Sequence, residues 1–62
     1  MDPTTCYTEM LLSLQDGDIE SARAHASNLR RWLSSGGFSP QDQDAVAVIS
    51  QLERVLRLTV AQ

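Results

Sequence analysis

Cysteine, histidine and aromatic residues are scarce in this sequence, and each shortage argues against a kind of site. The chain has one Cys, one His, one Trp, one Tyr and one Phe. A lone cysteine, Cys6, forms no intramolecular disulfide, so the framework that small secreted domains usually need is missing. Zinc sites take about four ligands, mostly Cys and His. We therefore expect no metal, no cofactor and a reducing, cytoplasmic compartment.

Long apolar runs and a surplus of basic residues are also missing. No uninterrupted apolar stretch approaches the roughly 20 residues of a membrane-spanning helix, and Met1–Thr5 has none of the basic residues of a signal peptide. Five Lys and Arg against eight Asp and Glu give a net charge of −3, whereas nucleic-acid-binding domains usually carry a basic excess. All five cations are arginine, which we interpret as the mark of a GC-rich bacterial coding sequence. We expect neither a membrane nor nucleic acid as the main partner.

The 62 residues are enough for one domain, and 42% of them are hydrophobic. Three helices are predicted, at about 3–15, 18–35 and 40–60, in a single all-α domain spanning residues 1–62. The first helix has Asp2 as N-cap and Pro3 at its first position, and Gly17 ends it in the left-handed conformation. We expect this short helix to pack as a clip across an antiparallel pair formed by the other two.

The second helix starts at Asp18 and stops at Gly36 and Gly37. Its border carries His25 and Trp32, of which Trp32 is either a lid on the core or an anchor at an interface. Its predicted buried stripe consists of Ile19, Ala22, Ala26, Leu29 and Leu33.

The third helix has the clearest start signal, with Ser39 as N-cap, Pro40 at the first position and Asp42 in a place like that of a capping box. Phe38, just before it, is expected to pack on the end of the bundle. The apolar arc of the helix covers roughly 180°, which is more than one neighbour needs. Its members are Ala45, Val46, Val48, Ile49, Leu52, Val55, Leu56, Thr59 and Val60, and Leu58 falls outside the arc.

No catalytic constellation is recognisable. Cys6 and His25 could come close across the first two helices, but a nucleophilic dyad needs an orienting third group. We interpret Cys6 as a small apolar packing residue. Gly36 and Gly37 lack the Lys and the preceding strand of a phosphate-binding loop, so we interpret them as a helix stop. We expect no enzyme and no small-molecule substrate.

The segment 17–22, of sequence GDIESA, resembles the turn and second helix of a tetratricopeptide repeat. Gly17, Asp18 and Ala22 fit that pattern. The preceding helix lacks the Trp/Leu-Gly-Tyr pattern of the family, Ser34 stands where its terminal Pro is expected, and no second repeat follows, although a solenoid needs about three. We interpret the resemblance as convergence on a common helical hairpin and carry over no peptide-binding residues.

The wide apolar arc of the third helix and the small size predict self-association. Chains near 60 residues bury only about 60% of their unfolded surface, and association compensates for a small core. We expect a small bacterial or phage adaptor or regulator that forms a homodimer. The candidate interface residues are Trp32, Val48, Leu52, Val55, Leu56 and Leu58.

Two alternatives stay open. A monomeric domain could bind another protein through its third helix, as in helix-in-groove recognition. Arg23, Arg30 and Arg31 share the outer face of the second helix and could contact an acidic partner or, in a helical hairpin, nucleic acid. The plainer interpretation is a solvated face whose arginines pair with Glu20 or with neighbouring chains.

Overall fold

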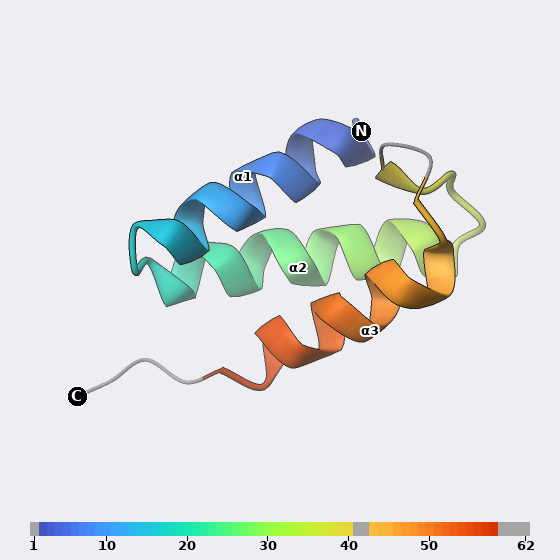
Figure 1. Cartoon of the computed structure of the whole chain (residues 1–62). Helices are drawn as coiled ribbons and strands as arrows, with labels where there is room; N and C mark the ends of the chain where they lie inside the picture. Colours follow the sequence, from blue (N-terminus) through green and yellow to red (C-terminus); the bar gives the residue numbers. More distant parts are fainter. Residues whose placement is uncertain (1, 41–42, 59–62) are drawn as a thin grey trace.

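The computed structural model describes residues 2–40 and 43–58, which form three α-helices and no strand (Figure 1). They are α1 (Pro3–Gln15), α2 (Ile19–Ser34) and α3 (Ala45–Leu56). The chain reverses direction after α1 and again after α2, and both outer helices pack against α2. The predicted all-α architecture of three helices is therefore confirmed.

The first two helices begin where their capping residues predict. The Asp2 carboxylate accepts a hydrogen bond from the backbone N–H of Thr4 at 3.0 Å, and Pro3 occupies the first turn. The Asp18 carboxylate accepts from the N–H of Ser21 at 3.2 Å. Each cap satisfies an N–H group that the helix itself leaves without a partner.

A short turn joins α1 to α2. Gly17 adopts a φ of 77°, and its N–H donates to the Leu14 carbonyl at 3.1 Å. The N–H of Asp18 donates to the Ser13 carbonyl at 2.8 Å, which completes a Schellman motif. Because Asp18 also caps α2, one residue ends the first helix and begins the second.

Helix α3 begins later and ends earlier than predicted. Its N-cap is Asp44, whose carboxylate accepts from the Val46 N–H at 3.3 Å. Pro40 is buried, and its carbonyl accepts from the Gln43 N–H at 3.0 Å. Proline suits the start of a turn as well as that of a helix, so the signal at Ser39 and Pro40 starts a turn instead.

The remaining predictions for the ends of α3 fall partly outside the described residues. Asp42 at the start, and Thr59 and Val60 at the end, are not described. The described helix stops at Leu56, with Arg57 as its C-cap, instead of continuing to about residue 60.

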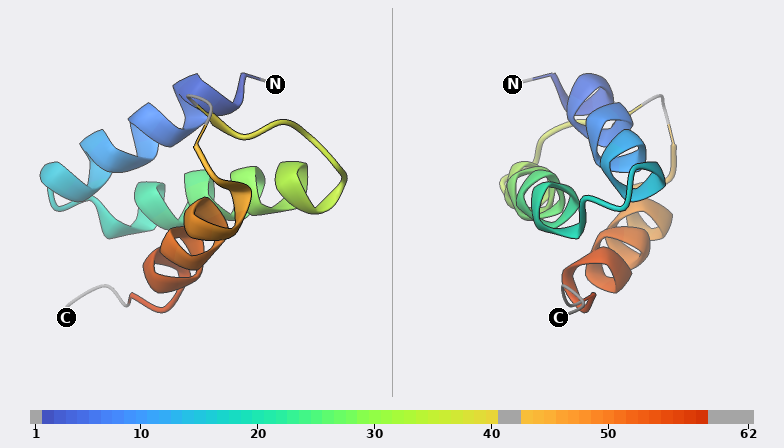
Figure 2. Two further views of the ribbon diagram at one scale, coloured as in Figure 1. Left: turned by 45° about the vertical axis from the view of Figure 1, so that its right-hand side comes forward. Right: turned by 90° about the vertical axis from the view of Figure 1, so that its left-hand side faces the viewer.

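The core lies along α2 and is lined by all three helices (Figure 2). Ala22 and Ala26 are fully buried, and their small side chains leave room for close packing against α2. The buried hydrophobic residues are Tyr7, Met10, Ala22, Ala26, Leu29, Leu33, Val48, Leu52 and Val55.

The expected clip of α1 across an α2–α3 pair is wrong. In the structure α2 carries the packing, and each outer helix contacts it separately. A hydrogen bond of 2.6 Å from the Tyr7 hydroxyl to Gln51 Oε1 links α1 to α3. Nor is α1 the short helix, since it has 13 residues and α3 has 12.

Among the described residues, the wide apolar arc of α3 is mostly covered within the chain. Val48, Leu52 and Val55 are buried, and Ile49 and Leu56 pack partly buried against the same core. The accessible surface is 4149 Å², against about 4,000 Å² for a folded monomer of this mass. Most of the described part of this arc is therefore buried in the core of its own chain.

Candidate interaction site

Trp32, near the end of α2, holds the segment that follows the helix. Its indole N–H donates to the Phe38 carbonyl at 3.0 Å. The two rings meet edge to face, with centroids 5.6 Å apart and planes at 87°, an arrangement that aromatic pairs favour. We call Trp32 and Phe38 the aromatic corner.

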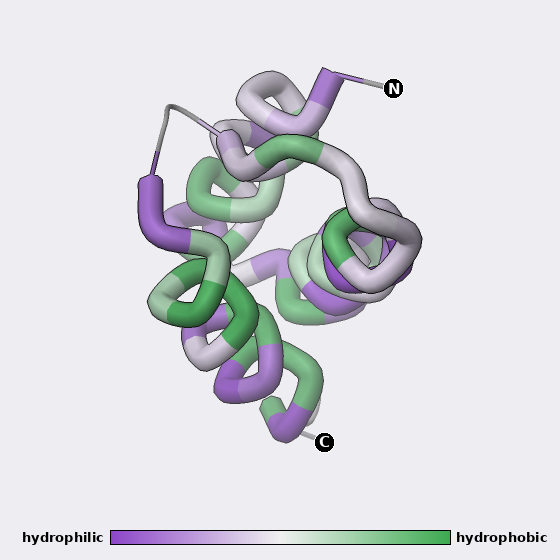
Figure 3. The backbone as a smooth tube through the Cα atoms, turned by 90° about the vertical axis from the view of Figure 1, so that its right-hand side faces the viewer, coloured by the Kyte–Doolittle hydropathy of each residue, from purple (hydrophilic) through white to green (hydrophobic). Residues whose placement is uncertain are grey.

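Phe38 is 67% exposed, so the expectation that it packs on the end of the bundle is wrong. Its carbonyl is bound to the Trp32 indole, and its ring contacts that indole instead of the buried core. In Figure 3 the connection from α2 to α3 carries a hydrophobic segment between weakly polar ones. The aromatic corner therefore leaves most of one phenyl ring in solvent.

Gly37 fixes the other side of the indole. A Cβ at this position would overlap the Trp32 ring, so only glycine fits here without a shift. Its N–H also donates to the Trp32 carbonyl at 3.0 Å, and Gly36, with a φ of 90°, donates to Leu33 at 3.1 Å. These bonds form a second Schellman motif. Trp32 is therefore held by main-chain bonds and by close packing at once.

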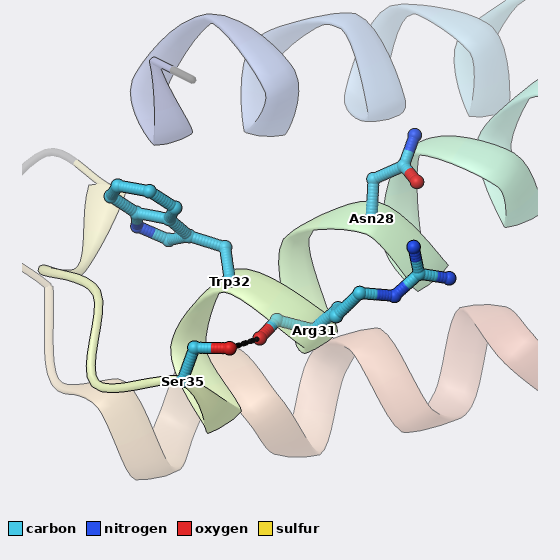
Figure 4. Close-up of a pocket in the computed structure, with 4 residues that line it drawn as sticks. All are labelled: Asn28, Arg31, Trp32 and Ser35. Atoms are coloured by element: carbon cyan, nitrogen blue, oxygen red, sulfur yellow. Dashed lines mark hydrogen bonds between the residues drawn. The ribbon is translucent and has the colours of Figure 1, made fainter.

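An open groove of about 210 Å³ lies along α2 beside the aromatic corner (Figure 4). It is lined by Asn28, Arg31, Trp32 and Ser35, whose spacing places them on one face of the helix. The Trp32 ring lies at one end, and the Arg31 guanidinium and the Asn28 amide lie toward the other. The Ser35 hydroxyl donates to the Arg31 carbonyl at 2.9 Å. We call this the Trp32 groove.

The three candidate arginines are exposed, but they do not all share one face of α2. At about 100° per residue, Arg23 lies nearly above Arg30, whereas Arg31 is displaced around the helix. Only Arg31 lines the groove. Within the part of the chain that the structure describes, the one ion pair joins His25 and Glu9, so no arginine there is paired with Glu20 or another carboxylate.

The predicted interface residues separate into two groups. Trp32 lines the groove, Leu58 is 41% exposed, and Leu56 is partly buried. Val48, Leu52 and Val55 belong to the core of their own chain. We therefore revise the expectation for these three residues, because they are buried within their own chain.

Cys6 contacts the main chain of His25, not its imidazole. Its thiol donates to the His25 carbonyl at a distance of 3.3 Å from Sγ. The imidazole Nε2 lies 3.7 Å from Glu9 Oε2 instead. Burial, and then the nearby Glu9 carboxylate, raise the pKa of the Cys6 thiol. The predicted proximity is real, but the geometry suits packing and a weak hydrogen bond more than nucleophilic attack.

Sequence reasoning found Trp32 and Arg31 but missed Asn28, Ser35 and Gly37 as parts of one site. The spacing of Asn28, Arg31, Trp32 and Ser35 could have shown that they share a helix face. The contact of Gly37 depends on the path of the chain after α2, which no local pattern of residues indicates.

Residues 2–40 and 43–58 contain no group of three or more His, Cys, Asp or Glu residues arranged to hold a metal ion. None of their helices is both long enough and apolar enough to span a bilayer. In comparisons with known proteins, no family model matches the chain, and no curated protein or solved structure is significantly similar to it.

Proposed function

We propose that this chain is a small, non-catalytic protein–protein interaction module that acts as an adaptor or regulator in the cytoplasm. The observation that carries the proposal is the aromatic corner, which exposes Phe38 and presents Trp32 beside Arg31, an arginine with no ion pair among the described residues. Tryptophan and arginine are enriched among the residues that dominate binding energy. A side chain that is already fixed loses little further entropy on binding.

The size of the Trp32 groove also favours a protein partner. Its volume of about 210 Å³ is below the roughly 300–1,000 Å³ of typical small-molecule sites. An open surface on one helix face suits one or two side chains of another protein. The groove therefore supports an interaction module more than a receptor for a metabolite.

Recovery of partners from the source cell tests this proposal. The tagged wild-type chain is compared with Phe38→Ser and with the matched control Val46→Ser, whose valine is 70% exposed on α3. We expect quantitative mass spectrometry to find a protein enriched by the wild type and by Val46→Ser but lost with Phe38→Ser. Equal recovery by all three chains, or no enrichment over an untagged strain, would contradict the proposal.

A homodimer is the second candidate, and the apolar residues exposed on and just after α3 favour it. Val46 is 70% and Leu58 is 41% exposed. Because Val48, Leu52 and Val55 are buried, such a dimer would use the edges of α3 and not its central stripe. Sedimentation equilibrium from micromolar to millimolar concentration tests it. A folded monomer throughout that range would exclude the dimer.

Nucleic-acid binding is the remaining alternative from the sequence, with Arg23, Arg30 and Arg31 as its contacts. The net charge of −3 opposes it, because phosphate contacts depend on local positive charge. A mobility shift at low salt that disappears in Arg30→Glu would support it. Absence of any shift at low salt would remove it.

A further inference from the structure

The two ends of the Trp32 groove differ in chemistry. At one end, Gly37 packs against the Trp32 indole, and the Phe38 ring meets it edge to face. The part of the indole that these two residues leave uncovered gives this end of the groove an apolar surface. At the other end, the Arg31 guanidinium and the Asn28 amide both offer N–H donors (Figure 4). A ligand that fits this groove needs an apolar group and a hydrogen-bond acceptor side by side.

The donors at the polar end have no partner among the described residues. Arg31 forms no ion pair there, and no hydrogen bond occupies the Asn28 side chain. Ser35 differs, because its hydroxyl is already bonded to the Arg31 carbonyl. None of the described acidic residues lines the groove. The charge of Arg31 is therefore available to a carboxylate from outside the chain.

We infer that the Trp32 groove binds a segment of a partner protein in which an acidic side chain stands next to an apolar one. The apolar side chain packs on the Trp32 indole, and the carboxylate accepts hydrogen bonds from Arg31 and Asn28. This inference rests on the proposed function and names the chemistry of the partner. Charge-assisted hydrogen bonds to a guanidinium are about twice as strong as neutral ones. The groove should therefore bind a carboxylate more tightly than a neutral amide of the same shape.

Other occupants fit the charges less well. A nucleic-acid strand needs a positive surface that follows its backbone, but Arg23 and Arg30 lie around the helix from the groove and the chain has a net charge of −3. A groove of about 210 Å³ with one guanidinium has room for one acidic side chain and one apolar neighbour.

The chain contains one tryptophan, so the Trp32 indole N–H resonance reports directly on the groove. The full chain is titrated, at low salt, with a capped pentapeptide that has Leu-Glu at its centre and with the same peptide carrying Gln in place of Glu. We expect the Glu peptide to shift the Trp32 resonance and to bind at least about threefold more tightly than the Gln peptide. The preference should shrink as salt is raised.

Two variants separate the groove from general electrostatics. Arg31→Gln should bind both peptides equally, whereas the matched control Arg30→Gln, with the same net charge and the same helix, should keep the preference. Both arginines are exposed, and thermal unfolding monitored by circular dichroism checks that each variant keeps the wild-type fold. Equal binding of the two peptides by the wild type overturns the inference, as does equal loss of preference in both variants.

Two further outcomes identify another occupant and also overturn the inference. A Trp32 resonance that moves with protein concentration, in the absence of peptide, assigns the groove to a second copy. A stronger shift with a single-stranded oligonucleotide than with the Glu peptide assigns it to nucleic acid. If partner recovery depends on Phe38 while neither peptide binds, the interaction module stands and only this inference fails. If no partner depends on Phe38, the proposed function itself fails.

Discussion

The two connections between helices are built differently, although both follow a Schellman motif. The turn from α1 to α2 is made by Gly17 and Asp18, which use only backbone bonds and one carboxylate. The segment after α2 is held by the Trp32 side chain, through its bond to the Phe38 carbonyl and its packing against Gly37. The first connection is held by bonds within its own turn. The second is also held by contacts of the Trp32 side chain, which lines the groove as well.

The largest effect on stability is expected from a substitution in the core of α2, because both connections join a helix that packs on α2. Leu29 is fully buried at the middle of α2, which carries the packing of both outer helices. Leu29→Ala should lower the free energy of unfolding by about 2–5 kcal/mol, which is comparable with the whole stability of so small a domain. Urea unfolding measures the change. Leu12→Ala, on a residue 53% exposed, is the control and should cost less than about 0.5 kcal/mol.

Gly37→Ala against Gly17→Ala separates the two connections directly. A Cβ at Gly37 would overlap the indole, and we expect a loss of about 2 kcal/mol together with a change in Trp32 fluorescence. A Cβ at Gly17 would meet open space, so only its φ of 77° is strained, at about 1 kcal/mol and with unchanged fluorescence. If both variants left the fluorescence unchanged, Gly37 would not be packed against Trp32.

The sequence predicts the first connection better than the second for a physical reason. Asp2, Asp18 and Gly17 act within one helical turn, so their types and spacing are enough to place them. The predicted start of α3 is wrong because Pro40 suits a turn as well as a helix, and the N-cap of α3 is Asp44. A proline restricts the backbone to conformations that occur both in turns and at helix starts, and the packing of the rest of the chain selects between them.

The same limit explains how much of the candidate site could be predicted. Helical periodicity indicates that Val48 and Leu52 lie on an apolar face, but it does not say whether that face meets its own chain or a partner. In the structure, this face packs into the chain's own core. Trp32 could be singled out by type and position, whereas its contact with Phe38 depends on how the chain returns after α2.

A smaller effect is expected from the bond that ties α1 to α3. Tyr7→Phe removes the hydroxyl that donates to Gln51 at 2.6 Å, and a neutral hydrogen bond contributes about 1 kcal/mol. Unfolding in urea should show this loss, with no change in Trp32 fluorescence, because the bond involves neither Trp32 nor Phe38. Gln51→Ala should lower stability by a similar amount. If the double variant lost the full sum of both changes, the two side chains would not be coupled.

The smallest effect concerns the cap shared by the two helices of the first connection. Hydrogen bonds from Ser21 lower the pKa of the Asp18 carboxyl below its ordinary value of 3.8. Since the folded-state pKa is the lower one, this stabilisation is complete above pH 3.8 and is lost as the pH falls through the folded-state pKa. Asp18→Asn keeps a good N-cap that does not titrate. We expect its thermal midpoint to depend less on pH below that value than the wild type's. An identical acid dependence in Asp18→Asn and the wild type would show that the charge of this cap contributes nothing to the hairpin.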